Sequence, residues 1–288
     1  MTGDAITVRA LTKTYGDHHA VAGLDLDIHD GEIFSLLGPN GAGKTTTVEI
    51  LEGFRDRDGG SVTVLGEDPG RAGASWRNRI GVVLQSATGL DLLTPREVLR
   101  STAGFYAAPR DVEEVIAATG LAEKADARVA GLSGGQRRRL DVALGIVGRP
   151  DLLFLDEPTT GFDPQARRDF WELIRSLKDE GTTIVLTTHY LDEAEALADR
   201  VGVIAGGTLL ALDTPARIGG RESQDAVVSW AEGGSRQVVT TPTPTALVAE
   251  LSERLGGEVP ELTVTRPTLE ETYLALIAPH VANGSEER

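Results

Sequence analysis

Short apolar runs separated by polar turns predict an α/β core in the first part of the chain. Four such runs are typical of buried strands: residues 33–37, 80–84, 152–155 and 183–187. Segments with helical spacing or helix-start residues follow the first three runs, at residues 46–52, 91–130 and 163–180. Strands that alternate with helices in this way predict an α/β fold.

A small β layer is expected ahead of this core. Residues 6–9 and 24–28 alternate apolar and polar positions, which is the pattern of half-buried antiparallel strands, and a further strand is expected at 62–65. Residues 91–148 look mainly helical, because Thr94 and Glu97 have capping-box spacing and a proline follows Thr94. We therefore predict a core domain at residues 1–215 with a helical subdomain inserted at 91–148.

Residues 222–280 predict a separate, small α+β domain at the C-terminal end. The expected elements are two hairpin strands around Gly233-Gly234, a helix, a third strand and a last helix: residues 226–230, 237–240, 245–255, 262–265 and 268–277. Thr268 and Glu271 have the spacing of a capping box at the start of the last helix. Residues 283–288 are expected to fray.

A glycine-rich loop connects the first apolar run to its helix. Its sequence is Gly38-Pro39-Asn40-Gly41-Ala42-Gly43-Lys44-Thr45, which matches the phosphate-binding pattern G-x-x-x-x-G-K-[ST]. The glycines let the backbone N–H groups point inward, and the helix N-terminus adds a favourable dipole. Lys44 is expected at the outer phosphates, the Thr45 hydroxyl on magnesium, and Thr46 beside them. The loop predicts a nucleoside triphosphate, ATP or GTP, bound with Mg.

Polar residues end three of the other buried runs. Asp156 and Glu157 follow the third run, where a P-loop protein needs a magnesium-binding carboxylate and then a base that faces the attacking water. Gln85 and His189 end two further runs and point at the same edge, where an α/β sheet binds its ligand. For Gln85, a solvated loop residue is an equal alternative.

The segment Leu132-Ser133-Gly134-Gly135-Gln136 precedes the third buried run. Ser133 and Gln136 have capping-box spacing, so a helix is expected to begin here and to end near residue 148. The three arginines at residues 137–139 lie in its first turn, where positive charge opposes the helix dipole. They predict either an anion site or a solvated basic face. Tyr15, in a polar turn, is either a surface residue or an aromatic face on which adenine could stack.

Composition narrows the range of partners. The formal net charge is −16 and the pI is about 4.7, which argues against binding to nucleic acid and against direct attraction to anionic lipid. There are no cysteines, which suits a reducing compartment. No apolar run approaches the roughly 18 residues of a membrane span, and the N-terminus lacks the regions of a signal peptide. Any link to a membrane is therefore expected to come through a partner.

Taken in chain order, these motifs resemble the nucleotide-binding subunit of an ABC transporter. The resemblance covers about residues 5–215, and Leu-Ser-Gly-Gly-Gln ahead of an apolar run that ends in Asp-Glu is its most specific part. Phe162 is one departure, because the family usually has leucine there. The arginine run after the signature motif and residues 267–273 resemble, more weakly, bacterial drug and antibiotic export ATPases. The fold implied is a P-loop NTPase core with an N-terminal antiparallel β layer, an inserted helical subdomain and a small C-terminal α+β appendage.

The resemblance also implies a role for each residue. Tyr15 would stack on adenine, and Gln85 would touch magnesium and water and face the membrane partner. Residues of the signature motif, Ser133, Gly134, Gly135 and Gln136, would contact the ATP of a second copy packed head to tail. Glu157 would be the catalytic base, Asp163 the D-loop aspartate, and His189 a contact of the γ-phosphate. The implied partner is an integral-membrane permease, which would hold the subunit at the cytoplasmic face of the cell membrane.

Two other classes of ATPase share these motifs. Soluble ABC ATPases that act on ribosomes normally carry two cassettes, and those that act on DNA split the cassette with a long coiled coil. This chain has one cassette and no heptad run between Lys44 and Ser133. A non-enzymatic, ATP-gated regulatory module is disfavoured by the presence of Glu157 and His189. Within the transporter class, import stays open as an alternative to export.

Overall fold

The computed structural model describes residues 3–83 and 90–283, and for 281–283 the backbone alone. The chain divides into two compact units, Met1–Leu212 and Asp213–Arg288. No helix within these described ranges has the length and apolar character needed to cross a bilayer.

A six-stranded sheet runs through the first unit. Its order is β5-β6-β7-β3-β8-β9, and the pairs from β5 to β8 are parallel. The strands are β3 (Ile33–Leu37), β5 (Ile80–Val83), β6 (Leu152–Asp156), β7 (Thr183–Thr187), β8 (Arg200–Ala205) and β9 (Thr208–Asp213). The four buried runs found in the sequence are the first four of these strands. The last two were not expected, although β8 is an apolar run of the same kind.

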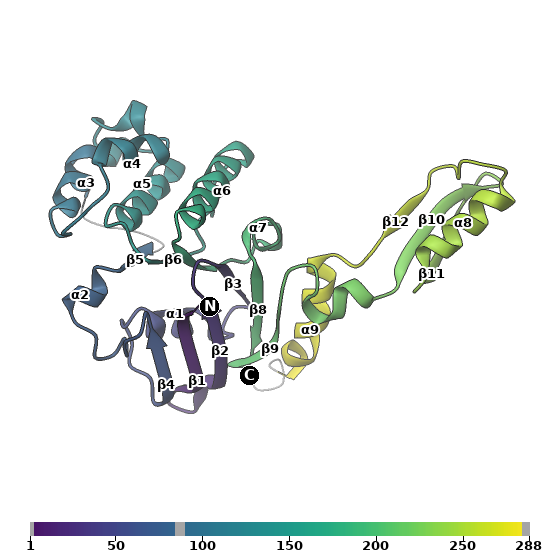
Figure 1. Cartoon of the computed structure of the whole chain (residues 1–288), viewed down its shortest axis with the longest axis horizontal. Coiled ribbons are helices and arrows are strands. Elements are labelled where there is room, and N and C mark those ends of the chain that lie inside the picture. Colours follow the sequence, from purple (N-terminus) through teal and green to yellow (C-terminus); the bar gives the residue numbers. More distant parts are fainter. Residues whose placement is uncertain (1–2, 84–89, 284–288) are drawn as a thin grey trace. The chain divides into compact units, whose positions relative to one another are not determined.

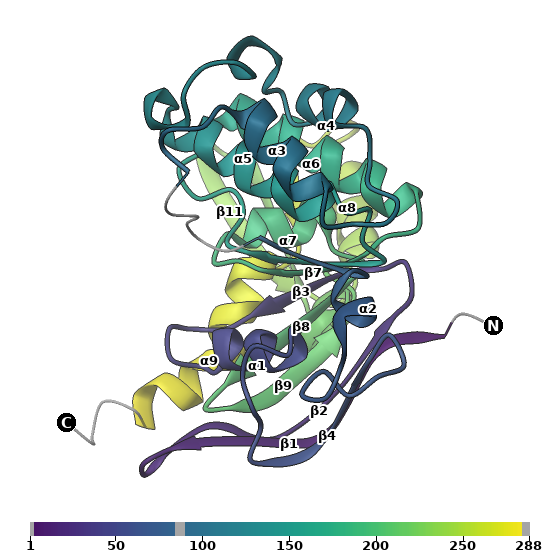
Figure 2. The same ribbon diagram turned by 90° about the vertical axis from the view of Figure 1, so that its left-hand side faces the viewer.

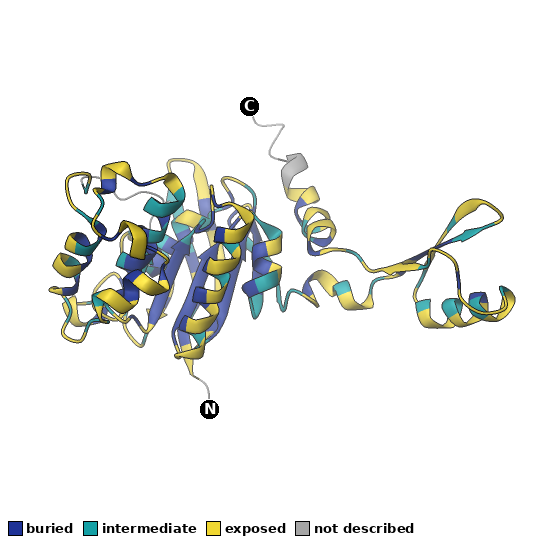
Figure 3. Cartoon of the chain, turned by 90° about the horizontal axis from the view of Figure 1, so that it is seen from above, coloured by how far each residue is buried: buried dark blue, intermediate teal, exposed yellow. Residues whose placement is uncertain are grey.

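The sheet is buried on both faces because its strands carry apolar residues at consecutive positions. In β6, Leu153 and Leu155 belong to one core cluster, while Leu152 and Phe154 belong to the other. This follows from the two-residue repeat of a strand. Figure 3 shows the buried strands at the centre of the unit, with exposed residues on the outer faces of the helices.

An antiparallel β layer covers one face of the sheet. It contains β1 (Asp4–Tyr15), β2 (His18–His29) and β4 (Gly59–Val64), in the order β2-β1-β4. The expected layer is confirmed, but β1 runs well beyond residue 9. The register of β1 shifts at this point and Ala10 has a positive φ of 48°, so the regular alternation of the sequence is interrupted by a bulge.

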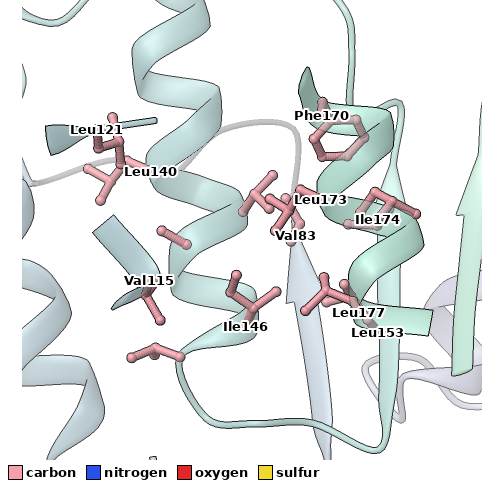
Figure 4. Close-up of a cluster of buried hydrophobic side chains, with 14 of the residues drawn as sticks. Val83, Val115, Leu121, Leu140, Ile146, Leu153, Phe170, Leu173, Ile174 and Leu177 are labelled. Carbon is pink, nitrogen blue, oxygen red and sulfur yellow. The ribbon is translucent and has the colours of Figure 1, made fainter. Parts of the chain in front are cut away.

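The helices between residues 95 and 197 cover the opposite face, whereas the two helices before residue 80 pack on the same side as the β layer, as Figures 1 and 2 show. The helices of this unit are α1 (Lys44–Leu51), α2 (Ala74–Arg77), α3 (Pro95–Ala103), α4 (Val112–Ala118), α5 (Gly134–Ile146), α6 (Pro164–Asp179) and α7 (Leu191–Leu197), with 3-10 turns η1 (Ala122–Lys124) and η2 (Val129–Gly131). Of the three expected capping boxes, the two that belong to this unit are present, at Thr94–Glu97 and Ser133–Gln136. Side chains of α4, α5 and α6 meet Val83 and Leu153 of the sheet in one apolar cluster (Figure 4).

The second unit has a core of its own. It comprises η3 (Ile218–Ser223), β10 (Ala226–Glu232), β11 (Ser235–Thr241), α8 (Pro244–Arg254), β12 (Thr263–Thr265) and α9 (Leu269–Asn283), with the strand order β11-β10-β12. Val228, Trp230 and Leu251 are buried in its apolar cluster. The expected end of the last helix at residue 277 is wrong: α9 continues to Asn283 and contains Pro279 in its interior. The fraying expected after residue 283 lies outside the described residues.

Candidate functional site

The glycine-rich loop lies between β3 and α1, in the context that its sequence pattern requires. Gly43 caps the helix in the left-handed region, with φ 99°. A Cβ atom added there would lie 2.1 Å from the carbonyl oxygen of Ala20, and one added at Gly38 would lie 2.4 Å from that of Ile204. Only glycine fits at these two positions, so the loop is packed closely against its neighbours.

The ammonium of Lys44 folds back over this loop. It donates hydrogen bonds to the carbonyl oxygens of Gly38, at 2.6 Å, and Pro39, at 3.1 Å. Burial lowers the pKa of Lys44, and the nearby carboxylates of Glu157 and Asp156 act in the opposite direction. The cation is therefore held by neutral carbonyl groups close to two acids, where a phosphate oxygen would be a stronger partner.

The two acids occupy the carboxyl end of β6. Asp156 pairs with Thr187 across β6 and β7, and the Thr187 hydroxyl donates a hydrogen bond to the Asp156 carboxylate. The N–H of Glu157 donates to the Thr187 carbonyl at 3.0 Å, and the φ of Glu157 is 46°. A non-glycine residue in the left-handed region is strained, and such strain is concentrated at functional sites. His189 lies with its Nδ1 atom 3.2 Å from Oε1 of Glu157.

A cavity of about 420 Å³ collects most of the residues selected from the sequence. The expected residues that line it are Tyr15, Asn40, Gly41, Ala42, Gly43, Lys44, Thr45, Thr46, Asp156 and Glu157. Two further lining residues, His18 and Ala20, were missed. In the sequence, only their position pointed to the cavity, because they follow Tyr15 by three and five residues.

Tyr15 is the last residue of β1 and not part of the turn, which begins at Gly16. Its side chain is half exposed at the rim of the cavity. The Arg55 guanidinium lies 5.3 Å from the centre of the Tyr15 ring, and the Lys13 ammonium lies 5.6 Å from it. Both cations are close enough to be attracted to the electron-rich face of the ring.

The signature residues lie apart from that cavity. Ser133 accepts a hydrogen bond from the N–H of Gln136, and the Gln136 side chain accepts one from the N–H of Ser133, so both cap α5. Asp163 caps α6 and accepts hydrogen bonds from two backbone N–H groups, which lower its pKa. Neither these residues nor Gly135 line the cavity around Lys44. Gly134 lines a second cavity of about 390 Å³, which also reaches Glu157.

The arginines that follow the signature motif do not form a free basic surface. Arg137 pairs with Asp91 at 2.9 Å, and Arg139 with Asp169 at 3.7 Å. Arg138 is only 6% exposed, because it lies on the inward face of α5. It donates hydrogen bonds to the backbone carbonyls of Asp156 and Pro158. For Arg138, the expectation of a solvated face is wrong, whereas the anion site stays a prediction.

Gln85, which was expected at the site, lies outside the described residues. Phe162, where the family usually has leucine, is buried and packs edge-on against Phe170, with ring centres 5.9 Å apart. Among residues 3–83 and 90–283, no group of three or more His, Cys, Asp or Glu side chains is arranged to hold a metal ion.

Comparisons with known proteins give the family. The family model described as ABC transporter matches residues 21–160. The Nod factor export ATP-binding protein I of Rhizobium sp. (strain N33) is 44% identical over 75% of this chain and 72% of its own length. The chain belongs to the ABC transporter family. The daunorubicin/doxorubicin resistance ATP-binding protein DrrA of Streptomyces peucetius is 45% identical over 73% of this chain. The matched part of this chain covers 65% of the length of that relative. The resemblance to an ATP-binding subunit of the export type is confirmed.

Solved structures confirm the fold of this ABC subunit. An ATP-binding subunit of an ABC transporter matches with a TM-score of 0.71 at 21% identity, over 94% of this chain and 99% of that chain. A dimeric, post-hydrolysis state of the ATP-binding cassette MJ0796, bound to ADP and Pi, matches with a TM-score of 0.66 at 24% identity, over 73% and 98%. The P-loop NTPase core with its antiparallel β layer is therefore the fold of the family.

Proposed function

We propose that this ABC subunit hydrolyses ATP to drive export of drugs, antibiotics or other hydrophobic compounds through a separately encoded membrane permease. The observation that carries the proposal is the meeting of Lys44, Glu157 and His189, which three different strands deliver to one edge of the sheet. The ATPase would occupy residues 1–215, with the helical subdomain at 91–148. Residues 222–280 would form an accessory domain that supports dimerisation or coupling.

ATP binding is supported by the cavity around the glycine-rich loop. Its volume of about 420 Å³ lies in the range of small-molecule sites. In the proposed complex, the Lys44 ammonium exchanges the carbonyls of Gly38 and Pro39 for phosphate oxygens. The adenine ring stacks on Tyr15 at the rim. Asn40 and the neighbouring backbone N–H groups of the loop surround the phosphates.

The residues at the site fit a magnesium ion. The Thr45 hydroxyl and the Asp156 carboxylate line the same cavity and are the oxygen ligands that Mg²⁺ prefers. A single carboxylate is sufficient, because Mg²⁺ usually keeps several water ligands and takes its other ligands from substrate phosphates. Gln85 would be the third protein contact. When bound, the ion supplies positive charge against the triphosphate.

Hydrolysis is assigned to Glu157 and His189. The Glu157 carboxylate would orient a water molecule and accept its proton as the water attacks the γ-phosphate in line. His189 would hold the γ-phosphate and keep the carboxylate in place through their close contact. Lys44 would neutralise charge on the outer phosphates. Backbone strain at Glu157 supports this assignment, because a strained residue is typical of a positioned catalytic group.

A head-to-tail dimer would give the signature residues their role. Ser133, Gly135 and Gln136 do not line the cavity of their own chain, and the space beside Gly134 is open. In the proposed dimer they contact the γ-phosphate of ATP held by the second copy, with Asp163 at the same interface. The related cassette fold solved as a post-hydrolysis dimer supports this arrangement.

The permease and the exported compounds are inferred from the relatives. Their printed names describe daunorubicin and doxorubicin resistance and Nod factor export. The permease would hold the subunit at the cytoplasmic face of the cell membrane, with no nucleic acid involved. The test is to express the chain together with a multi-span membrane protein encoded beside it in a drug-sensitive host. Two results together would support the proposal: the two proteins co-purify, and the chain confers drug resistance that Lys44→Ala abolishes. Resistance that is unchanged by Lys44→Ala would contradict it.

A further inference from the structure

Arg138 holds the backbone on both sides of Glu157. Its Nε atom donates to the carbonyl oxygen of Pro158 at 3.1 Å, and its Nη2 atom donates to the carbonyl oxygen of Asp156. One guanidinium therefore fixes the residue before Glu157 and the residue after it. Arginine suits this task, because its planar fork presents several donors in a fixed geometry.

The segment that Arg138 holds is a strained one. Glu157 has its φ at 46°, which an L-residue adopts only when the surroundings impose it. From the side of β7, the Thr187 carbonyl accepts a hydrogen bond from the N–H of Glu157 at 3.0 Å. From the side of α5, Arg138 binds the two flanking carbonyls. The position of Glu157 thus depends on a helix as well as on the sheet.

The charges around Arg138 keep a buried guanidinium in place. Burial lowers its pKa, while the carboxylates of Asp141, Asp156, Glu157 and Glu193 raise it. Asp141, on the same helix and also buried, has its pKa raised to about 6 by burial, against the effect of Arg138 and Arg137. Since a guanidinium keeps its proton in proteins, Arg138 remains a cation among these acids.

The helix that carries Arg138 also carries the signature motif. Ser133 is the N-cap of α5, and Arg138 follows it by five residues on the same rigid element. A cavity of about 390 Å³ lies beside them and is lined by both Gly134 and Glu157. A small shift of α5 toward this space would move the guanidinium and the backbone that it holds.

We propose that Arg138 is a positioning residue that couples the signature end of α5 to Glu157 of the same chain. The inference rests on the proposed function, in which the signature motif contacts ATP held by the second copy while Glu157 acts on ATP held by its own chain. Arg138 therefore links the two ATP sites of the dimer. Binding of ATP at one site sets the catalytic base of the other, which makes hydrolysis cooperative.

The test compares Arg138→Met and Arg138→Lys with Arg139→Met in the full chain. Met keeps the approximate length of the side chain but removes the hydrogen bonds that Arg138 donates to both carbonyls, whereas Lys keeps the positive charge without the planar fork of donors. Arg139 is the matched control, because it lies next to Arg138 and pairs with Asp169 of α6 instead of the backbone around Glu157. Steady-state ATPase rates against Mg-ATP concentration give kcat, KM and the Hill coefficient. Binding of Mg-ATP gives Kd, and thermal unfolding reports the fold.

We expect Arg138→Met to lower kcat by roughly 10–100-fold, as displaced catalytic groups do, with Kd changed by less than about threefold. The Hill coefficient should fall from above 1 to about 1, because the coupling between sites is lost. Arg138→Lys should recover part of kcat, and Arg139→Met should resemble the wild type. If Arg138→Met does not fold, the same test applies to Arg138→Lys: the proposal then requires a lowered kcat with a nearly unchanged Kd.

Wild-type kcat and cooperativity in a folded Arg138 variant would overturn the proposal. So would equal losses in Arg138→Met and Arg139→Met, which would indicate a general weakening of α5. A wild-type protein with a Hill coefficient of 1 would contradict the coupling between sites. Failure of the proposed function looks different, because the wild-type chain itself would then hydrolyse no ATP.

Discussion

The imidazole of His189 lies with Nδ1 at 3.2 Å from Oε1 of Glu157. The two residues follow β6 and β7, and the parallel register that pairs Asp156 with Thr187 brings them together. Their side chains are 48% and 26% exposed, so water reaches both. A carboxylate that is held by a neighbour and open to water can activate a nucleophilic water molecule. The glycine-rich loop that follows the adjacent strand, β3, brings Lys44 to the same edge of the sheet.

Replacement of Lys44 by alanine tests the phosphate site. The substitution removes the main point charge proposed at the outer phosphates, and it also removes a partly buried cation that donates to the backbone carbonyls of Gly38 and Pro39. We expect loss of most ATP binding and of hydrolysis, while the melting temperature stays close to that of the wild type. Titration with a fluorescent ATP analogue and an ATPase assay would show this. Near-normal turnover in folded Lys44→Ala protein would rule out the phosphate-binding role of the loop.

Replacement of Gly135 by aspartate tests the signature motif. The added Cβ atom would meet Phe162 at 3.9 Å, which is ordinary contact, so the variant should fold. We expect it to bind ATP as the wild type does, because Gly135 does not line the cavity around Lys44. Hydrolysis should stop, since the new carboxylate faces the γ-phosphate across the dimer interface. Wild-type ATPase activity, or activity in isolated monomers, would contradict the composite site.

Deletion of residues 222–288 tests the accessory domain. The removed part has its own apolar core, and the described residues that line the cavity around Lys44 belong to the first unit. We therefore expect ATP affinity to be kept, with weaker dimerisation or weaker coupling to the permease. Equilibrium binding of Mg-ATP and analytical ultracentrifugation would measure the two effects. Complete loss of ATP binding in a folded truncation would show that the domain boundary is misplaced.

Glu52, at the end of α1, should make the stability of the protein depend on pH. Burial, together with Asp156 and Glu49, raises the pKa of Glu52 from 4.5 to about 8. The folded protein therefore holds this proton more tightly than the unfolded chain. The stability that the protonated carboxyl provides is complete below pH 4.5 and is lost as the pH rises toward 8.

Glutamine mimics the protonated acid at all pH values. Glu52→Gln should therefore raise the melting temperature by about a few degrees at pH 8 and leave it nearly unchanged at about pH 5. Thermal unfolding at the two pH values measures the difference. Glu114→Gln, on the exposed face of α4, is the control and should shift the melting temperature equally at both. If Glu52→Gln changes the melting temperature equally at both pH values, Glu52 does not contribute to the pH dependence of stability.

The sequence predicted those parts of the site that depend on local structure. The loop at residues 38–45 and the acids at the end of β6 follow apolar runs, and the end of such a run can be recognised in the sequence. Arg138 was misread because its direction depends on how α5 packs, which a short run of arginines does not show. The bulge at Ala10 hid most of β1, since it interrupts the alternation. The separation of the signature residues from the cavity is a tertiary feature, and no spacing in the chain could have predicted it.

The most direct test of the account is Glu157→Gln, followed by size-exclusion chromatography with and without Mg-ATP. Glutamine keeps the shape of the side chain but removes the base and one negative charge beside the triphosphate. Hydrolysis should fall by roughly 10²–10⁴-fold, while ATP binding is kept or tightened. The stalled protein should elute as a dimer with Mg-ATP and as a monomer without it. Wild-type hydrolysis would contradict the role of Glu157, and a stalled protein that stays monomeric with Mg-ATP would contradict the head-to-tail dimer.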